Sequence, residues 1–397
     1  MCLYPVTIKN KRFLPNKKNG GNPPKCTDHR LLYVDCDCGY CYECRKKNAR
    51  QWRIRMSEEL KTNPHAIFFT GTFTDERIEK LSKKYGIEKD DYNGIATKEM
   101  RLFLERLRRK NNGKSVKHWA VTERGHTGTR RIHIHGIFFH EDKQYLLRLL
   151  RECWTAGYKY NGKYVNEKTI NYIVKYITKT DLDNPNFRAK VLCSAGLGKN
   201  YIKSWAGKET RYIPKTETTC TRDWYIFKNG QKACLPRYYR EKLFTEDERQ
   251  LLWIEKQEEG YSYVMGEKVE TKDDFQTMEY KKLKEYYRSY CIRVHKDNPN
   301  DWEKARDKNR MLRQIRKQQI WEEKQRKWKD AIRLRSSIHK NKAKFNLYER
   351  QQTKEDFEKD IETYKYLYEN NPFKVFSGGG SEKPYAEIAY ALQTASS

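Results

Sequence analysis

Hydrophobic positions in the first two thirds of the chain follow the period of a strand in some segments and of a helix in others. Three segments rich in β-branched and aromatic residues predict strands, namely residues 65–73, 117–123 and 131–139. A short turn with Gly and Thr separates the last two, so we expect them to form a hairpin. Asn-Gly pairs are typical of hairpin turns and predict two more hairpins, over residues 158–165 and 225–234.

Residues 167–179 have the apolar spacing of a helix. Three isoleucines and a valine share one arc, and the opposite arc carries Tyr172, Lys175, Tyr176 and Lys179. Tyrosines that only filled the core would sit on the apolar arc. The pattern therefore favours two phenols that face solvent or a ligand over core packing.

Further helices are expected over residues 45–60 and 100–107. Together these elements predict an α+β fold, with a mainly antiparallel sheet flanked by helices. We divide the chain into a basic Cys-rich arm and helix, a catalytic-type α+β domain, a charged helical region, and a flexible linker with a tail: residues 1–60, 61–244, 245–376 and 377–397.

Charge changes this picture by indicating a partner. Lysine and arginine number 83 against 53 acidic residues, a formal net charge of +30, and 13% of residues are aromatic. This balance favours an anionic polymer such as nucleic acid. The excess is high in residues 304–344, which we interpret either as a DNA-backbone contact surface or as a solvated helix face. No segment resembles a membrane span or signal peptide, so we expect a cytosolic protein without membrane contact.

Strand alternation places His133 and His135 side by side on one face. Imidazole is a common metal ligand, and a divalent ion that handles phosphate also favours a carboxylate, which Glu123 on the preceding strand could supply. Gly136 would let a phosphate backbone approach. Alternatively, the histidines only line a polar sheet face. Two other residues could replace Glu123 as third ligand, namely His126 and Glu141.

The two tyrosines of residues 167–179 are candidate nucleophiles. A phenol has an ordinary pKa of about 10, and neighbouring ammonium groups favour its ionised form and neutralise an incoming phosphate. Lys175 and Lys179 are placed for both tasks. Attack on phosphorus would leave a 5′-phosphotyrosine and a free 3′-hydroxyl, and two tyrosines one turn apart would permit a second transfer.

Four of the eleven cysteines lie within residues 36–44, namely Cys36, Cys38, Cys41 and Cys44. They predict either a structural Zn²⁺ site, in which Cys26 could replace Cys36, or free thiols. The basic helix that follows is expected to contact DNA. Its candidate DNA-binding residues are Arg45, Lys46, Lys47, Arg50 and Arg53.

Several motifs together resemble one known family. They are Met1-Cys2-Leu3-Tyr4-Pro5, Cys38-x-x-Cys41-x-x-Cys44 followed by Arg50-Gln51-Trp52, the His-x-His strand, Tyr172 to Lys179, and Leu235-Pro236-Arg237-Tyr238-Tyr239. This set resembles the replication initiators of the microviruses, especially the gokushovirus branch, within the HUH endonuclease superfamily. Ile132 departs from the family pattern, which usually has Pro before the first motif histidine.

The resemblance implies a rolling-circle replication initiator. It implies His133 and His135 as ligands of Mg²⁺ or Mn²⁺, and Tyr172 and Tyr176 as nucleophiles that nick and rejoin one strand at the origin. The implied partners are single-stranded and supercoiled double-stranded viral DNA, host helicase and host DNA polymerase, in the host bacterial cytoplasm. The alternatives are another HUH enzyme (a plasmid initiator, relaxase or transposase) and a non-enzymatic, zinc-stabilised DNA-binding or packaging protein.

Overall fold

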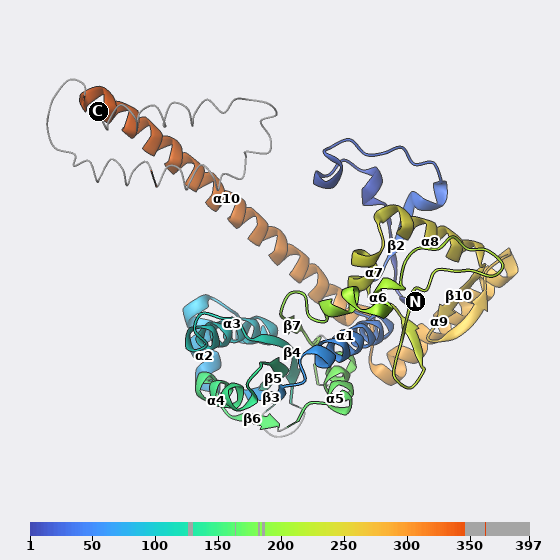
Figure 1. Cartoon of the computed structure of the whole chain (residues 1–397), viewed down its shortest axis with the longest axis horizontal. Coiled ribbons are helices and arrows are strands. Elements are labelled where there is room, and N and C mark those ends of the chain that lie inside the picture. The colour runs from blue at the N-terminus through green and yellow to red at the C-terminus, as the bar shows by residue number, and fades with distance from the viewer. Residues whose placement is uncertain (126–129, 163, 182, 185–186, 346–361, 363–397) are drawn as a thin grey trace. The chain divides into compact units, whose positions relative to one another are not determined.

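The computed structural model of the chain describes residues 1–125, 130–162, 164–181, 183–184, 187–345 and 362 (Figure 1). Packing divides the chain into two compact units, Met1–Glu303 and Lys304–Ser397. The predicted linker and tail over residues 377–397 lie outside the described residues. No helix in the described part is both long and apolar enough to cross a membrane.

Five antiparallel strands form the central sheet of the first unit, in the order β6-β3-β5-β4-β7. Their bounds are β3 Ala66–Thr72, β4 Lys117–Arg124, β5 Ile132–Phe139, β6 Lys159–Gly162 and β7 Val191–Cys193. The α+β class is therefore confirmed. The strand over residues 65–73 and the hairpin made by residues 117–123 and 131–139 are confirmed as well.

The Asn-Gly pair at residues 161–162 does not form a hairpin turn. Both residues lie in the edge strand β6, where Gly162 pairs with Phe68 of β3. The hairpin predicted over residues 158–165 is wrong, because pairing with a strand distant in sequence outweighs a local turn preference. The second Asn-Gly pair does join two antiparallel strands, β8 (Trp224–Ile226) and β9 (Lys232–Cys234).

Three helices cover one face of the sheet, namely α2 (Asp75–Tyr85), α3 (Tyr92–Lys110) and α4 (Lys143–Cys153) (Figure 1). Four fully buried rings form the centre of this layer: Phe69, Phe103, Phe138 and Trp154. Trp154 meets Phe69 and Phe103 edge to face, with ring centroids 5.3 and 5.1 Å apart. Such contacts add to the stabilisation that comes from burying the rings.

Helices α1 (Tyr42–Thr62) and α5 (Glu167–Thr178) pack against the other face. The α5 helix begins at a capping box, in which Asn166 and Thr169 exchange side-chain and backbone hydrogen bonds. Its predicted apolar arc is buried: Ile170, Ile173, Val174 and Ile177. The predicted helices over residues 45–60 and 100–107 lie within α1 and α3.

Beyond the sheet, α1 also contacts a small aromatic cluster. Its elements are the 3-10 helix η4 (Lys199–Lys203), α6 (Trp205–Lys208) and α7 (Arg237–Leu243), next to the β8-β9 hairpin. Tyr201, Tyr225 and Tyr239 are buried there against Ile54 of α1. This cluster therefore fixes the middle of α1, which also packs on α5.

The N-terminal segment pairs with itself and packs on residues that follow 244. Its elements are β1 Val6–Lys9, η1 Lys11–Phe13, η2 Lys17–Asn19, η3 His29–Leu31 and β2 Tyr33–Cys36. The later segment contains α8 Glu246–Glu258, β10 Tyr261–Val264, β11 Glu267–Glu270 and α9 Asp274–His295. The β10-β11 hairpin corrects the expectation that this region is wholly helical, since alternating Tyr and Val residues there favour a strand.

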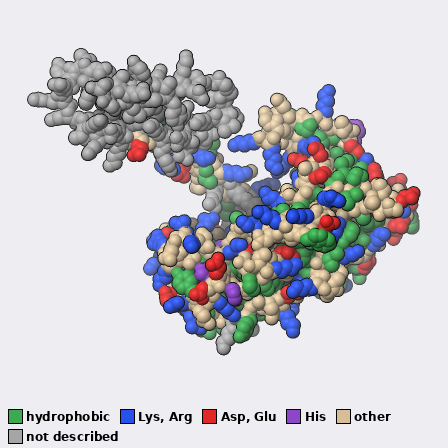
Figure 2. All heavy atoms as spheres, viewed as in Figure 1, with side chains coloured by type: hydrophobic (Ala, Val, Ile, Leu, Met, Phe, Trp, Pro, Cys, Tyr) green, Lys and Arg blue, Asp and Glu red, His purple; other side chains and the backbone are tan. Residues whose placement is uncertain are grey.

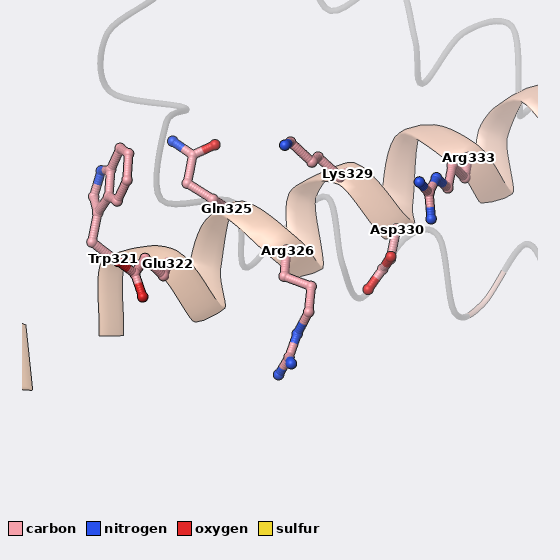
Figure 3. Close-up of a pocket in the computed structure, with 7 residues that line it drawn as sticks. All are labelled: Trp321, Glu322, Gln325, Arg326, Lys329, Asp330 and Arg333. Atoms are coloured by element: carbon pink, nitrogen blue, oxygen red, sulfur yellow. The ribbon is translucent and has the colours of Figure 1, made fainter. Parts of the chain in front are cut away.

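The long helix α10 spans Pro299–Phe345. Trp302 in its first turn is fully buried within the first unit and stacks on Tyr40. In the second unit, a shallow hollow is lined by seven residues of this one helix: Trp321, Glu322, Gln325, Arg326, Lys329, Asp330 and Arg333 (Figure 3). None of the predicted site residues lies there.

The α4 helix offers a test of the packing. We expect Leu150→Ala to lower the free energy of unfolding by about 2–5 kcal/mol, because this fully buried side chain would leave a cavity between α4 and the sheet. Leu147→Ala, in the same helix at a half-buried position, should cost less. Urea unfolding followed by circular dichroism measures both, and equal losses would contradict this packing.

Candidate functional site

The register of the sheet brings the three predicted metal ligands to neighbouring positions. Glu123 of β4 pairs with His133 of β5, and His135 lies one alternation further along β5. The His135 Nε2 atom is 2.7 Å from a Glu123 carboxylate oxygen, and its Nδ1 atom is 3.0 Å from the Thr70 hydroxyl of β3. Three adjacent strands therefore hold the ring of His135 in one orientation.

His133 has a polar atom that suits a ligand. Its Nδ1 atom is buried and makes no hydrogen bond in the described part of the chain. Burial, followed by the charge of His135, lowers the pKa of His133 and so favours the neutral imidazole that metals bind. A buried nitrogen without a partner is costly, and a cation would satisfy it.

Glu123 supplies negative charge beside both histidines. Burial opposes its ionisation, but hydrogen bonds from His135 and Lys179 outweigh that effect and lower its pKa. The three ligand atoms are less tightly gathered than in a formed metal site: among the described residues, only a group of four cysteines brings three or more ligand atoms within 4.8 Å of one another. The three residues could hold a divalent ion if Glu123 exchanged its contact with His135 for the ion.

The two tyrosines of α5 lie directly above this part of the sheet. Their hydroxyl oxygens are 2.6 Å apart, and the Tyr176 ring stacks on His135 with centroids 4.2 Å apart and nearly parallel planes. Tyr172 is 52% exposed, so one phenol is open to solvent while the other is half-buried. Helical spacing thus joins the predicted nucleophiles to the predicted ligands.

The lysines of α5 do not act on the phenols as expected from the sequence. Lys179 forms an ion pair with Glu123, and Lys175 is exposed. Burial, then the hydrogen bond with Tyr172 and the charge of Glu123, raise the pKa of Tyr176. The expectation that the lysines favour the Tyr176 phenolate is therefore wrong for this arrangement, because a carboxylate lies closer to the site and takes up the Lys179 charge.

Gly136 does not open the site to a phosphate. It lies on the opposite face of the sheet from the histidines, where an added Cβ atom would come within 3.0 Å of the Phe138 ring and 3.2 Å of the Trp119 carbonyl oxygen. Its role is close packing in the core, which corrects the prediction. Of the alternative ligands, Glu141 follows the far end of β5 from His133, and His126 lies outside the described residues.

The structure gathers a different set of four cysteines from the predicted one. Cys2, Cys38, Cys41 and Cys44 place their sulfur atoms within 4.8 Å of one another and could hold a metal such as zinc. Cys36 lies instead in β2 opposite Val6, and the Cys26 thiol donates to the Asp28 carbonyl. Cys36 and Cys26 are thus not part of the group, since alternation along β2 and the approach of the N-terminus decide its membership. The only sequence signal for Cys2 was its place in the N-terminal motif.

The basic residues of α1 have unequal access to solvent. Arg50 is exposed, and Lys47 is exposed but paired with Asp37. Lys46 and Arg53 are half-buried, and each lies over an aromatic ring. Arg45 is buried, at 4% exposure, and bonds to the end of α5, so its assignment to DNA contact is corrected. Its position on the inner side of α1 explains the difference.

Taken together, the fold and site define an α+β protein whose antiparallel sheet presents two histidines and a glutamate beneath a helix with two tyrosines (Figure 1). Residues 66–181, which contain all of these side chains, match the model of a family described as replication-associated protein ORF2.

Two curated proteins are also similar to the chain. One is the replication-associated protein ORF2 of Spiroplasma virus 4, 27% identical over 289 residues, which cover 65% of this chain and 85% of that protein. The other is the replication-associated protein VP4 of Bdellovibrio phage phiMH2K, 26% identical over 230 residues, 51% of this chain and 66% of that protein. No solved structure matches significantly. The matches confirm the resemblance to microvirus replication initiators and support a role in DNA replication.

Thr70 gives a test of the metal site that sequence reasoning missed, although it stands in the apolar strand before the helix-rich segment. We expect Thr70→Val to weaken Mn²⁺ binding about 10- to 100-fold, because the His135 ring loses the hydroxyl that orients it. Calorimetric titration of Mn²⁺ measures the change. Thr72→Val on the same strand is the control, since the Thr72 hydroxyl donates to the Tyr158 carbonyl instead. Equal effects would contradict an orienting role.

Proposed function

We propose that the protein initiates rolling-circle replication by nicking and rejoining one strand of viral DNA through a tyrosine-linked intermediate. The observation that carries the proposal is the meeting of the two phenol hydroxyls, 2.6 Å apart, above His135 and beside Glu123 and Lys179. A DNA-binding protein without catalysis would not need two phenols turned from the core toward two imidazoles and a carboxylate.

In the proposed reaction, the oxygen of one phenol forms a bond to the scissile phosphorus and loses its proton. The bond from phosphorus to the 3′ oxygen breaks, and that oxygen takes up a proton to become a 3′-hydroxyl. The products are a 5′-phosphotyrosine and a 3′ end that host polymerase could extend. Because one phosphodiester replaces another, the energy of the broken bond is retained for rejoining.

The other residues of the site have supporting roles. His133, His135 and Glu123 would hold a Mg²⁺ or Mn²⁺ ion, which polarises the scissile phosphate. Lys175, which is exposed on the same side of α5 as the phenols, is available to neutralise the bound phosphate. The second phenol is close enough to the first to accept the regenerated origin in a second cleavage.

The substrates we propose are the single-stranded origin and supercoiled double-stranded viral DNA, with a host helicase and polymerase acting afterwards in the host cytoplasm. Lys and Arg side chains are spread over the visible face of the first unit (Figure 2), and the net charge of +30 supports contact with a polyanion. A plasmid initiator, relaxase or transposase chemistry would use the same site. The non-enzymatic alternative rests on the charge and the four cysteines alone.

Covalent capture separates the enzymatic from the non-enzymatic proposal. Incubation with a single-stranded origin oligonucleotide and Mn²⁺ should give a protein–DNA adduct that survives a denaturing gel. Replacing both Tyr172 and Tyr176 by Phe should abolish the adduct, and each single replacement should leave part of it because the two hydroxyls lie together. Tyr164→Phe, at an exposed tyrosine outside α5, is the matched control. Absence of any adduct with folded protein and the correct origin would refute the nickase.

Arg50 tests the DNA-facing side of α1. We expect Arg50→Ala to reduce the slope of log affinity against log salt by about 1, because one phosphate contact is lost. Fluorescence anisotropy with labelled single-stranded DNA at several salt concentrations measures the slope. Arg109→Ala, at an exposed arginine on α3, should leave it unchanged. The same slope for both variants and the unmodified protein would exclude Arg50 from the interface.

A further inference from the structure

The four clustered cysteines have the spacing of a tetrahedral metal site. The Sγ atoms of Cys2 and Cys41 are 3.8 Å apart, as are those of Cys38 and Cys44. A tetrahedron with zinc–sulfur bonds of about 2.3 Å has sulfur–sulfur edges of about 3.8 Å. A disulfide would need sulfurs about 2.05 Å apart, and all four cysteines are free thiols.

The backbone around these sulfurs is arranged for thiolates. Three backbone N–H groups donate to them: Cys38 to the Cys2 sulfur, and Tyr40 and Cys41 to the Cys38 sulfur, over 3.3 to 3.4 Å. Gly39 makes this turn with a φ of 79°, a conformation that favours glycine. Outer-shell hydrogen bonds of this kind orient metal ligands and stabilise their negative charge.

We propose that Cys2, Cys38, Cys41 and Cys44 bind one zinc ion that ties the N-terminus to α1, and that α1 passes this constraint through Arg45 to the end of the tyrosine helix α5. The zinc site stands independently of the proposed nicking reaction. The positioning role of Arg45 rests on that proposed function.

The segment that carries Cys2 is held from two sides. Cys2 and Leu3 are buried, and Arg288 of α9 donates to the Leu3 carbonyl. Cys41 is the residue that caps α1, and Cys44 lies in its first turn. An ion at this point would therefore join residues far apart in sequence, which stabilises a fold most where the closed loop is long.

Arg45, next to Cys44, bridges this cluster to α5. Its guanidinium donates to the Thr178 carbonyl over 2.8 Å and to the Thr180 hydroxyl over 3.2 Å. On its other side it lies 3.4 Å from the Asp297 carboxylate, which is fully buried. Asp297 in turn accepts a hydrogen bond from the Tyr42 backbone at the start of α1. A buried charge in such a network is costly to displace, so the end of α5 is held firmly.

The held end of α5 leads directly to the site. Lys179 follows Thr178 and pairs with Glu123, which contacts His135. A shift of this end would move the Lys179 ammonium and, within the same helix, the Tyr176 phenol that stacks on His135. Arg45 is thus a positioning residue, which acts on the site only through α5.

The metal assignment is tested by elemental analysis of the purified full chain. We expect about one zinc per chain, and a loss of most of it in Cys2→Ser, because three remaining thiolates bind weakly. Cys36→Ser is the matched control and should keep its zinc. Cobalt in place of zinc should give the intense thiolate charge-transfer absorption of a four-sulfur site in the unmodified chain, a readout that needs no variant. Iron in place of zinc, absence of metal, or loss from Cys36→Ser but not Cys2→Ser would overturn the assignment.

The positioning role is tested with Arg45→Met, which leaves all four cysteines in place. It should keep its zinc but speed hydrogen exchange of the amides in residues 174–179 by roughly tenfold or more, and lower kcat for nicking with little change in KM. Lys46→Met, at the next position of α1, should change neither. Unchanged exchange in Arg45→Met would overturn the positioning role. If the exchange changes but the unmodified protein does not nick DNA, the proposed function fails while the coupling stands.

Discussion

The antiparallel pairing of β4 with β5 is the constraint on which the candidate site depends. Glu123 lies opposite His133 in this register, and a slip of one residue would turn either the carboxylate or both imidazoles to the opposite face. The opposite face is filled by Phe69, Phe103 and Phe138 and has no room for polar groups. Core packing on one side of the sheet therefore fixes the chemistry on the other.

A second consequence of the sheet is the division of work between its faces. The α2-α3-α4 face holds the larger apolar core, whereas the α1-α5 face is apolar at one end and polar at the other. At the polar end the Tyr176 ring covers His135, so the aromatic side chain both packs and exposes a hydroxyl. This dual use explains how a helix buried along one arc can still present its phenols to a substrate.

Buried charges connect the parts of the first unit. Asp297, from the segment between α9 and α10, lies among the start of α1, Arg45 and Arg188, and each contact joins residues more than one hundred positions apart. Burial raises the pKa of Asp297, and the nearby guanidinium groups oppose that rise. Residues 245–303 are consequently part of the framework that supports the site, and not only an appended helical region.

The sequence by itself determined the features that depend on local period. Alternation along residues 131–139 put both histidines on one face, and the helical arc of residues 167–179 separated the tyrosines from the isoleucines. Only the tertiary structure decided that Cys2 joins the cysteine cluster instead of Cys36, that Arg45 is buried, that Gly136 faces the core, and that Asn161-Gly162 lies in a strand. The physical reason is that periods of 2 and 3.6 residues are properties of neighbouring residues. The environment of a cysteine, an arginine or a glycine is set by segments that approach from elsewhere in the chain.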